Sequence, residues 1–119
     1  MSTRRWETND GWEVLTGYVP DLGHYFLVIR RVCRTCGGEE AVGAERCRAC
    51  RGGYEYVFNN LDDRPAPYGA MRDLDDVMQT LGEHGIPHPD DLEGLLIVDE
   101  LTAAEDETDF GVLERGQAA

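Results

Sequence analysis

The sequence predicts an α+β fold in which a three-stranded antiparallel sheet is followed by two helices. Two observations predict it. β-Branched and aromatic residues gather in three short runs in the first half, and apolar residues recur with helical spacing in the second half. The chain has 119 residues, enough for one domain with one core. We expect that domain to span residues 1–104, followed by an acidic, flexible tail over residues 105–119.

Each predicted strand is short and bounded by turn residues. The three strands are expected at residues 12–18, 24–32 and 54–59. The second run is apolar without interruption from Tyr25 to Ile29. A short run of this kind favours a strand with neighbours on both sides over a helix.

The two helices are predicted from the spacing of apolar residues. One is expected at about residues 71–84, with four apolar side chains on one face: Leu74, Val77, Met78 and Leu81. Gly85 is expected just beyond its C-terminus. The other is expected to begin near His88, with Pro89 in its first turn, and to bury Leu92, Leu95, Leu96 and Leu101.

Four cysteines lie between the second and third predicted strands. They form two C-x-x-C units separated by ten residues: Cys33, Cys36, Cys47 and Cys50. Each unit is a tight turn that directs two thiolates to one point, and two such turns complete the tetrahedron that Zn²⁺ prefers. We therefore expect one structural zinc ion in a knuckle loop inserted into the sheet at residues 33–53. Four thiolates leave no open position for water, so the metal is expected to do no catalysis.

Other uses of four cysteines fit this chain less well. The N-terminus has no apolar signal segment and no run of about 18 apolar residues occurs, so we expect a cytoplasmic protein. Disulfides are rare in that reducing compartment. An iron–sulfur cluster also uses four cysteines, but the paired spacing favours a single metal ion.

The net charge of −13 is confined to the second half of the chain. Residues 1–60 contain eight acids and eight arginines, whereas residues 61–119 contain sixteen acids and three arginines. Such a surface repels phosphates and attracts basic proteins. Its candidate partner-binding residues are three acidic pairs: Asp62, Asp63, Asp75, Asp76, Asp90 and Asp91.

Arginines surround the cysteines. They are candidates either for neutralising the thiolates or for contacting phosphates, and the first role is the commoner one for a cluster of charges. The candidates are Arg34, Arg46, Arg48 and Arg51.

The sequence gives no positive sign of an enzyme. The three histidines form no metal-binding or nucleophile motif, and the only serine, Ser2, lies at the N-terminus. The acidic pairs occur at expected loops and helix starts. We therefore expect a protein that binds without catalysing a reaction.

Two resemblances carry some functional meaning. The cysteine segment, residues 33–53, resembles zinc ribbons, a functionally mixed class. Over residues 6–100 the chain also resembles small uncharacterised bacterial proteins of plasmids, phages and integrated mobile elements, which have a short loop in place of the cysteine segment. The strings that carry this second resemblance are Trp6-Glu7, Asp10-Gly11-Trp12-Glu13-Val14, Gly17-Tyr18, Tyr25-Phe26-Leu27-Val28, Phe58-Asn59-Asn60-Leu61-Asp62-Asp63 and Gly85-Ile86-Pro87.

The second resemblance implies a setting in mobile DNA, and the acidic half favours a basic protein as partner. We therefore expect an inhibitor of a host nucleic-acid-binding defence complex, similar to anti-CRISPR proteins that mimic nucleic acid. The alternative is a regulatory zinc ribbon that binds nucleic acid through the arginines beside its cysteines. Neither expectation includes a membrane, and the oligomeric state stays open.

Overall fold

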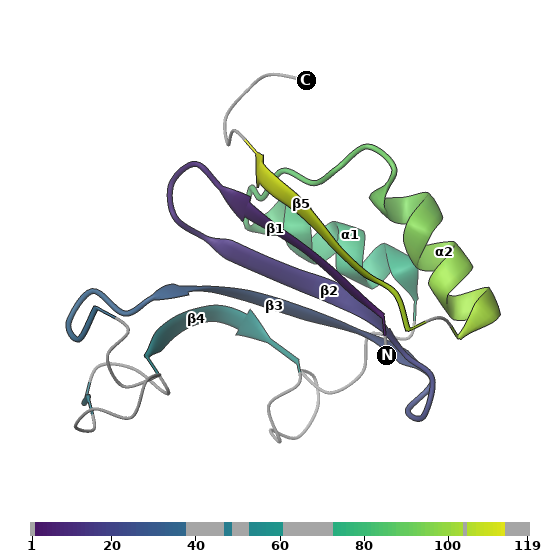
Figure 1. The fold of residues 1–119 in the computed structure, drawn as a ribbon, viewed down its shortest axis with the longest axis horizontal. Coiled ribbons are helices and arrows are strands. Elements are labelled where there is room, and N and C mark those ends of the chain that lie inside the picture. Colours follow the sequence, from purple (N-terminus) through teal and green to yellow (C-terminus); the bar gives the residue numbers. More distant parts are fainter. Residues whose placement is uncertain (1, 38–46, 49–52, 61–72, 104, 114–119) are drawn as a thin grey trace.

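The computed structural model describes residues 2–37, 47–48, 53–60, 73–103 and 105–113. The fold is α+β, with both helices in the C-terminal half and a five-stranded mixed sheet (Figure 1). In chain order the elements are β1 (Thr3–Thr8), β2 (Glu13–Val19), β3 (His24–Val32), β4 (Tyr54–Asn59), α1 (Leu74–Glu83), α2 (Leu92–Thr102) and β5 (Glu107–Leu113).

The sheet contains two more strands than the sequence predicted. Its order is β4-β3-β2-β1-β5. The neighbours β1 and β2, β2 and β3, and β3 and β4 pair antiparallel, and β5 lies parallel to β1. The predicted strands are β2, β3 and β4: β3 and β4 have the predicted bounds, β2 begins and ends one residue later, and β3 has a neighbour on each side. The expectation of a flexible tail was wrong for residues 107–113, because this segment forms β5.

The extra strand β1 alternates buried and partly exposed side chains. Arg4, Trp6 and Thr8 are buried, and Thr3, Arg5 and Glu7 between them are partly exposed. This period of two is that of a strand with one covered face. Because two of the three buried residues are polar, the strand does not appear as an apolar run in the sequence.

Helix α1 ends at Glu83, and Gly85 lies just beyond its C-terminus as predicted. Gly85 has φ +65°, and the backbone N–H groups of Gly85 and Ile86 donate to the carbonyls of Gly82 and Leu81. This pair of bonds is a Schellman motif, which satisfies carbonyls left over at a helix end. Val77 and Leu81 are buried and Leu74 and Met78 pack beside the core, which confirms the predicted face. The helix begins at Leu74, and residues 71–72 of the predicted range lie outside the described residues.

Helix α2 begins later than predicted and is rotated differently. It starts at Leu92, and the chain from Ile86 to Pro89 is not helical. Leu92 and Leu96 are buried as expected, but Leu101 is 79% exposed, so its assignment to the buried face was wrong. Asp99 is the third buried residue of the helix.

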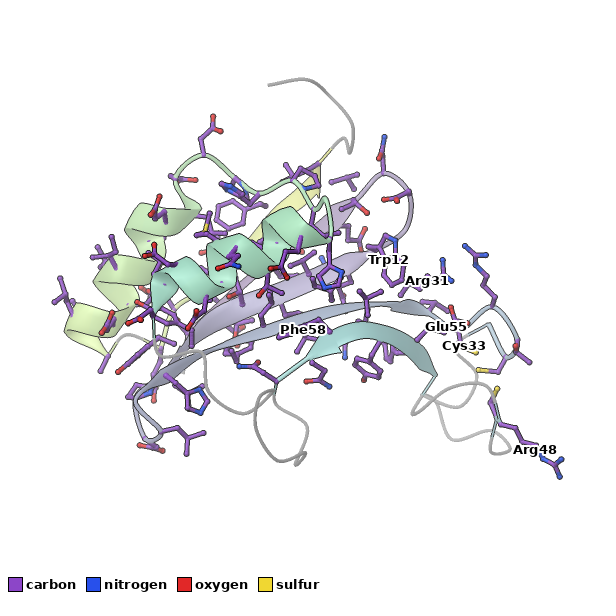
Figure 2. The ribbon with its side chains drawn as sticks, turned by 180° about the vertical axis from the view of Figure 1, so that it is seen from behind. Trp12, Arg31, Cys33, Arg48, Glu55 and Phe58 are labelled. Carbon is purple, nitrogen blue, oxygen red and sulfur yellow. The ribbon has the colours of Figure 1, made fainter. Side chains whose placement is uncertain are left out.

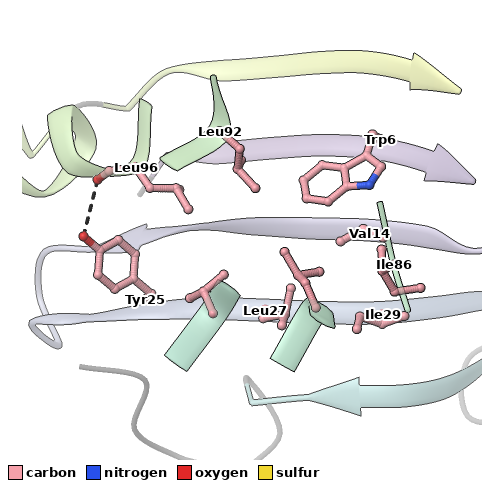
Figure 3. Close-up of a cluster of buried hydrophobic side chains, with 10 residues drawn as sticks. Trp6, Val14, Tyr25, Leu27, Ile29, Ile86, Leu92 and Leu96 are labelled. Carbon is pink, nitrogen blue, oxygen red and sulfur yellow. Dashed lines mark hydrogen bonds between the residues drawn. The ribbon is translucent and has the colours of Figure 1, made fainter. Parts of the chain in front are cut away.

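The core lies between the sheet and the two helices, which cover the same face of it (Figures 1 and 2). Figure 3 shows the side chains of Trp6, Val14, Leu27 and Ile29 directed from three adjacent strands toward the helices. Trp6 also donates its indole N–H to the Pro87 carbonyl at 2.8 Å, which fixes the chain between the helices. No helix among the described ranges is long and apolar enough to span a membrane.

A buried ion pair joins β1 to α2 and β5. Arg4 and Asp99 are 5% and 0% exposed. The Arg4 Nη2 and Nε atoms lie 2.6 and 3.1 Å from the two oxygens of the Asp99 carboxylate, and Nη1 donates to Thr108 Oγ1 of β5 at 2.5 Å. The guanidinium is therefore bound on three of its donors, as a buried charge requires.

We predict that Asp99→Asn strongly destabilises the fold. The substitution preserves shape but leaves the buried Arg4 charge uncompensated, and breaking a buried pair in this way costs about 3–5 kcal/mol. The measurement is urea unfolding followed by tryptophan fluorescence. Asp109→Asn is the matched control, since the Asp109 carboxylate also binds an arginine, Arg5, but is 57% exposed and should contribute about 1 kcal/mol or less. Equal losses in the two variants would contradict the role assigned to burial.

Candidate metal centre

The segment of residues 33–53, which we call the cysteine loop, connects the two strands of the hairpin formed by β3 and β4. Cys33 directly follows β3 and Gly53 directly precedes β4. The Cys33 backbone N–H donates to the Gly53 carbonyl at 2.8 Å, one residue beyond the Val32–Tyr54 pair that ends the ladder. The loop is therefore closed at its base by the sheet, and Cys33 is buried there.

The first C-x-x-C unit forms the tight turn that its sequence predicts. The Gly37 backbone N–H donates to the Cys33 carbonyl at 2.8 Å. Gly37 has φ +61°, a conformation that costs glycine little because it lacks a Cβ atom. This turn brings the thiols of Cys33 and Cys36 close enough together to serve as ligands of one metal ion.

Three of the four predicted ligands lie together. The Sγ atoms of Cys33, Cys36 and Cys47 are all within 4.8 Å of one another, and those of Cys33 and Cys47 are 3.9 Å apart. A tetrahedral zinc with Zn–S bonds of about 2.3 Å separates its sulfurs by about 3.8 Å. The cluster could therefore hold a metal ion such as zinc. Cys50, the fourth predicted ligand, lies outside the described residues.

Two arginines next to the loop are already bound by the sheet. Arg30 Nε lies 2.6 Å from Glu13 Oε1 and Arg31 Nε lies 2.7 Å from Glu55 Oε2. Their guanidinium groups also lie over aromatic rings. The Cζ atom of Arg30 is 4.0 Å from the centre of the Tyr54 ring, and that of Arg31 is 4.6 Å from the centre of a Trp12 ring. These two arginines thus join neighbouring strands.

Glu13 links the Arg30 pair to a second arginine. Its other carboxylate oxygen accepts from Arg5 Nε at 2.8 Å, so three adjacent strands share one ionic network. Burial alone would raise the pKa of Glu13, but hydrogen bonds from Arg30 and Arg5 outweigh it and hold that pKa below its usual value. The strands that carry the loop are therefore tied together by charge as well as by backbone hydrogen bonds.

The arginines proposed for phosphate contact are only partly described. Arg34 and Arg48 are exposed, and Figure 2 shows Arg48 directed away from the body of the protein. Arg46 and Arg51 lie outside the described residues. The exposed arginines of the loop are thus available to solvent rather than to the interior.

One group of acidic residues lies in what we call the acidic helical layer, residues 73–103. This layer contains nine carboxylates and no arginine or lysine. Asp99 is buried against Arg4, and the other eight are exposed: Asp73, Asp75, Asp76, Glu83, Asp90, Asp91, Glu93 and Glu100. Asp75 and Asp76 lie in the first turn of α1, and Asp90 and Asp91 directly precede α2. Asp62 and Asp63 lie outside the described residues.

A set of exposed apolar residues on α2 was not predicted from the sequence. Ile97, Val98 and Leu101 are all exposed. The helical repeat contains the signal that would have found them, because nine residues at about 100° each place Leu101 opposite the buried Leu92. Counting Leu101 with the core overlooked this rotation.

No protein-family model matches the chain, and no curated protein or solved structure does so either. The resemblances to zinc ribbons and to proteins of mobile elements therefore stay predictions. Function has to be inferred from the site and the surface alone.

We predict that Cys36→Ser weakens Zn²⁺ binding while the fold persists. Losing a ligand should cost more than about tenfold in affinity, since even an outer-shell change costs that much. The sheet and helices should remain folded because all residues of the core cluster lie outside the loop. The measurement is competition with a chromophoric chelator, together with far-ultraviolet circular dichroism.

Thr35→Ser is the control for this prediction, because Thr35 is exposed between the two cysteines of the first unit. It should bind Zn²⁺ as the unmodified protein does. Loss of the whole circular dichroism signal on chelation would contradict the view that the metal stabilises the loop alone.

Proposed function

We propose that this chain is a non-catalytic, acidic metal-binding protein that acts by binding another protein with a basic surface. The observation that carries the proposal is the acidic helical layer, with eight exposed carboxylates and no arginine or lysine. A field of one sign over one side of a protein speeds encounters with a surface of opposite sign and repels unsuitable partners.

In this proposal the metal has a structural role. Cys33, Cys36, Cys47 and Cys50 hold one zinc ion, and the closed set of four thiolates leaves no position for a substrate or water. The clustering of three of these thiols and the sulfur spacing of 3.9 Å support it. The ion would stabilise the loop at the end of the β3–β4 hairpin.

The target we propose is a nucleic-acid-binding defence complex of a host. A basic groove that binds phosphates also attracts a dense array of carboxylates, so the acidic helical layer would compete with nucleic acid for the groove. The resemblance to proteins of plasmids and phages gives such an inhibitor a setting. The proposal needs no catalytic residue.

We predict that the partner is captured in a salt-dependent way through the acidic helical layer. Capture from a host lysate on the immobilised chain should fall steeply between about 50 and about 500 mM salt, because screening weakens the attraction of exposed charges. The captured protein should bind nucleic acid, and the chain should compete for that binding. Capture that does not change with salt would sink the electrostatic proposal.

Matched variants localise the contact. Asp75→Asn/Asp76→Asn removes two charges from the acidic helical layer, and Asp21→Asn/Glu107→Gln removes two exposed charges from other parts of the chain. Affinity for the purified partner should fall with the first pair and change little with the second. Equal losses would mean that only the net charge matters.

A second candidate function is nucleic-acid binding by the cysteine loop. Exposed Arg34 and Arg48 favour it, since both stand beside the thiols while Arg30 and Arg31 are bound by carboxylates. Fluorescence anisotropy with labelled DNA and RNA at low salt separates the two functions. Binding that Arg34→Ala/Arg48→Ala abolishes would support this candidate, and no binding would remove it.

A further inference from the structure

Helix α2 is apolar on two opposite sides. Leu92 and Leu96 on one side are buried against the sheet. On the other side Ile97 is 44% exposed, Val98 50% and Leu101 79%. A helix that is apolar on both sides is ordinarily covered on both, and the described residues cover only one side of α2.

The exposed residues form one continuous stripe. Gly94, Ile97, Val98 and Leu101 are spaced i, i+3, i+4 and i+7, which aligns them along one helix face. A Cβ atom added at Gly94 would meet nothing within 4 Å, so the surface is open there. We call these four residues the α2 stripe. Contiguous exposed apolar residues with a polar border mark sites of protein interaction.

The border of the α2 stripe is acidic. Glu93 and Glu100 lie along one side of it and are exposed, and Asp90 and Asp91 lie at its N-terminal end. No arginine or lysine occurs in residues 73–103 to balance them. A ligand for this surface therefore needs apolar side chains in its centre and positive charge at its edge.

A second copy of this chain does not meet that requirement. Pairing two α2 stripes would bring two acidic helical layers together, each with eight exposed carboxylates. Like charges placed opposite each other oppose association. Charge complementarity thus selects a different protein as the occupant.

We propose that the α2 stripe is the docking site for an amphipathic helix of the partner protein. Its apolar residues would pack on Ile97, Val98 and Leu101, and its lysines or arginines would pair with Glu93 and Glu100. This is the mode in which an amphipathic helix binds an apolar surface through anchors spaced i, i+3, i+4 and i+7. The inference rests on the proposed function and adds the surface and the kind of segment that binds it.

The test uses three synthetic helical peptides that share one amphipathic pattern. The first has leucine on the apolar face and lysine on the polar face. The second replaces lysine with glutamate, and the third replaces leucine with serine. Each carries a fluorophore, and anisotropy reports its binding to the intact protein. We expect the leucine–lysine peptide to bind most tightly. Amide chemical shifts should change at Ile97, Val98 and Leu101 when it binds.

Variants connect this binding to the α2 stripe. Val98→Ser/Leu101→Ser should lower the affinity for the leucine–lysine peptide about tenfold or more, because two exposed apolar contacts are lost. Val32→Ser is the matched control. The exposed fraction of Val32, 52%, is similar to that of Val98, 50%, but Val32 lies at the end of β3 beside the cysteine loop. It should leave the affinity unchanged, and circular dichroism checks that both variants are folded.

Several outcomes would overturn the inference. A serine–lysine peptide that binds as tightly as leucine–lysine would show that the stripe contributes nothing, while the proposed function would stand on charge alone. A leucine–glutamate peptide that binds equally well would remove the charge requirement. A dimer in sedimentation that Val98→Ser/Leu101→Ser dissociates would identify a second copy as the occupant. The proposed function itself would fail in a different experiment, if capture of the partner from a host lysate did not depend on salt.

Discussion

The Arg4–Asp99 ion pair is the constraint that fixes the C-terminal half against the sheet. Neither charge can be buried alone, so β1 and α2 must meet where these residues face each other. The same guanidinium binds Thr108, which agrees with the register that pairs Arg4 with Thr108. It also fixes the rotation of α2. With Asp99 turned inward, Leu101 and its neighbours on the same side have to face outward.

The parts of the fold that could be predicted are those whose buried side is apolar. Strand β3 and the buried face of α1 follow from runs and spacings that only burial explains. Strand β4 has no buried residue and was predicted from its aromatic and β-branched residues. The two missed strands depend on contacts distant in sequence. β1 buries Arg4 and Thr8, and β5 is an edge strand with Glu107 and Asp109 exposed, so neither has an apolar pattern. β5 pairs only with β1, which itself pairs with β2 on its other side, and composition does not reveal these pairings.

The candidate site divides in the same way. Local spacing predicted the cysteine cluster, because the first C-x-x-C turn is set by a few neighbouring residues. The ion pairs of the arginines could not be predicted in this way, because their partners lie far along the chain. Arg30 is bound by Glu13 and Arg31 by Glu55. The α2 stripe combines both kinds of signal, because the helical repeat alone places Leu101 opposite Leu92. Its exposure follows from the burial of Asp99, whose partner Arg4 lies 95 residues away.

The distribution of charge argues for binding more strongly than its total does. Eight exposed carboxylates, five in the two neighbouring helices and three just before them, repel one another, which disfavours the compact state. Two acids of this layer are bound by the sheet: Asp99 compensates Arg4, and Glu100 accepts a hydrogen bond from the Tyr25 hydroxyl at 2.6 Å. In the proposed function, the exposed carboxylates of this layer would meet a basic partner, and the α2 stripe among them would be the place where that partner docks.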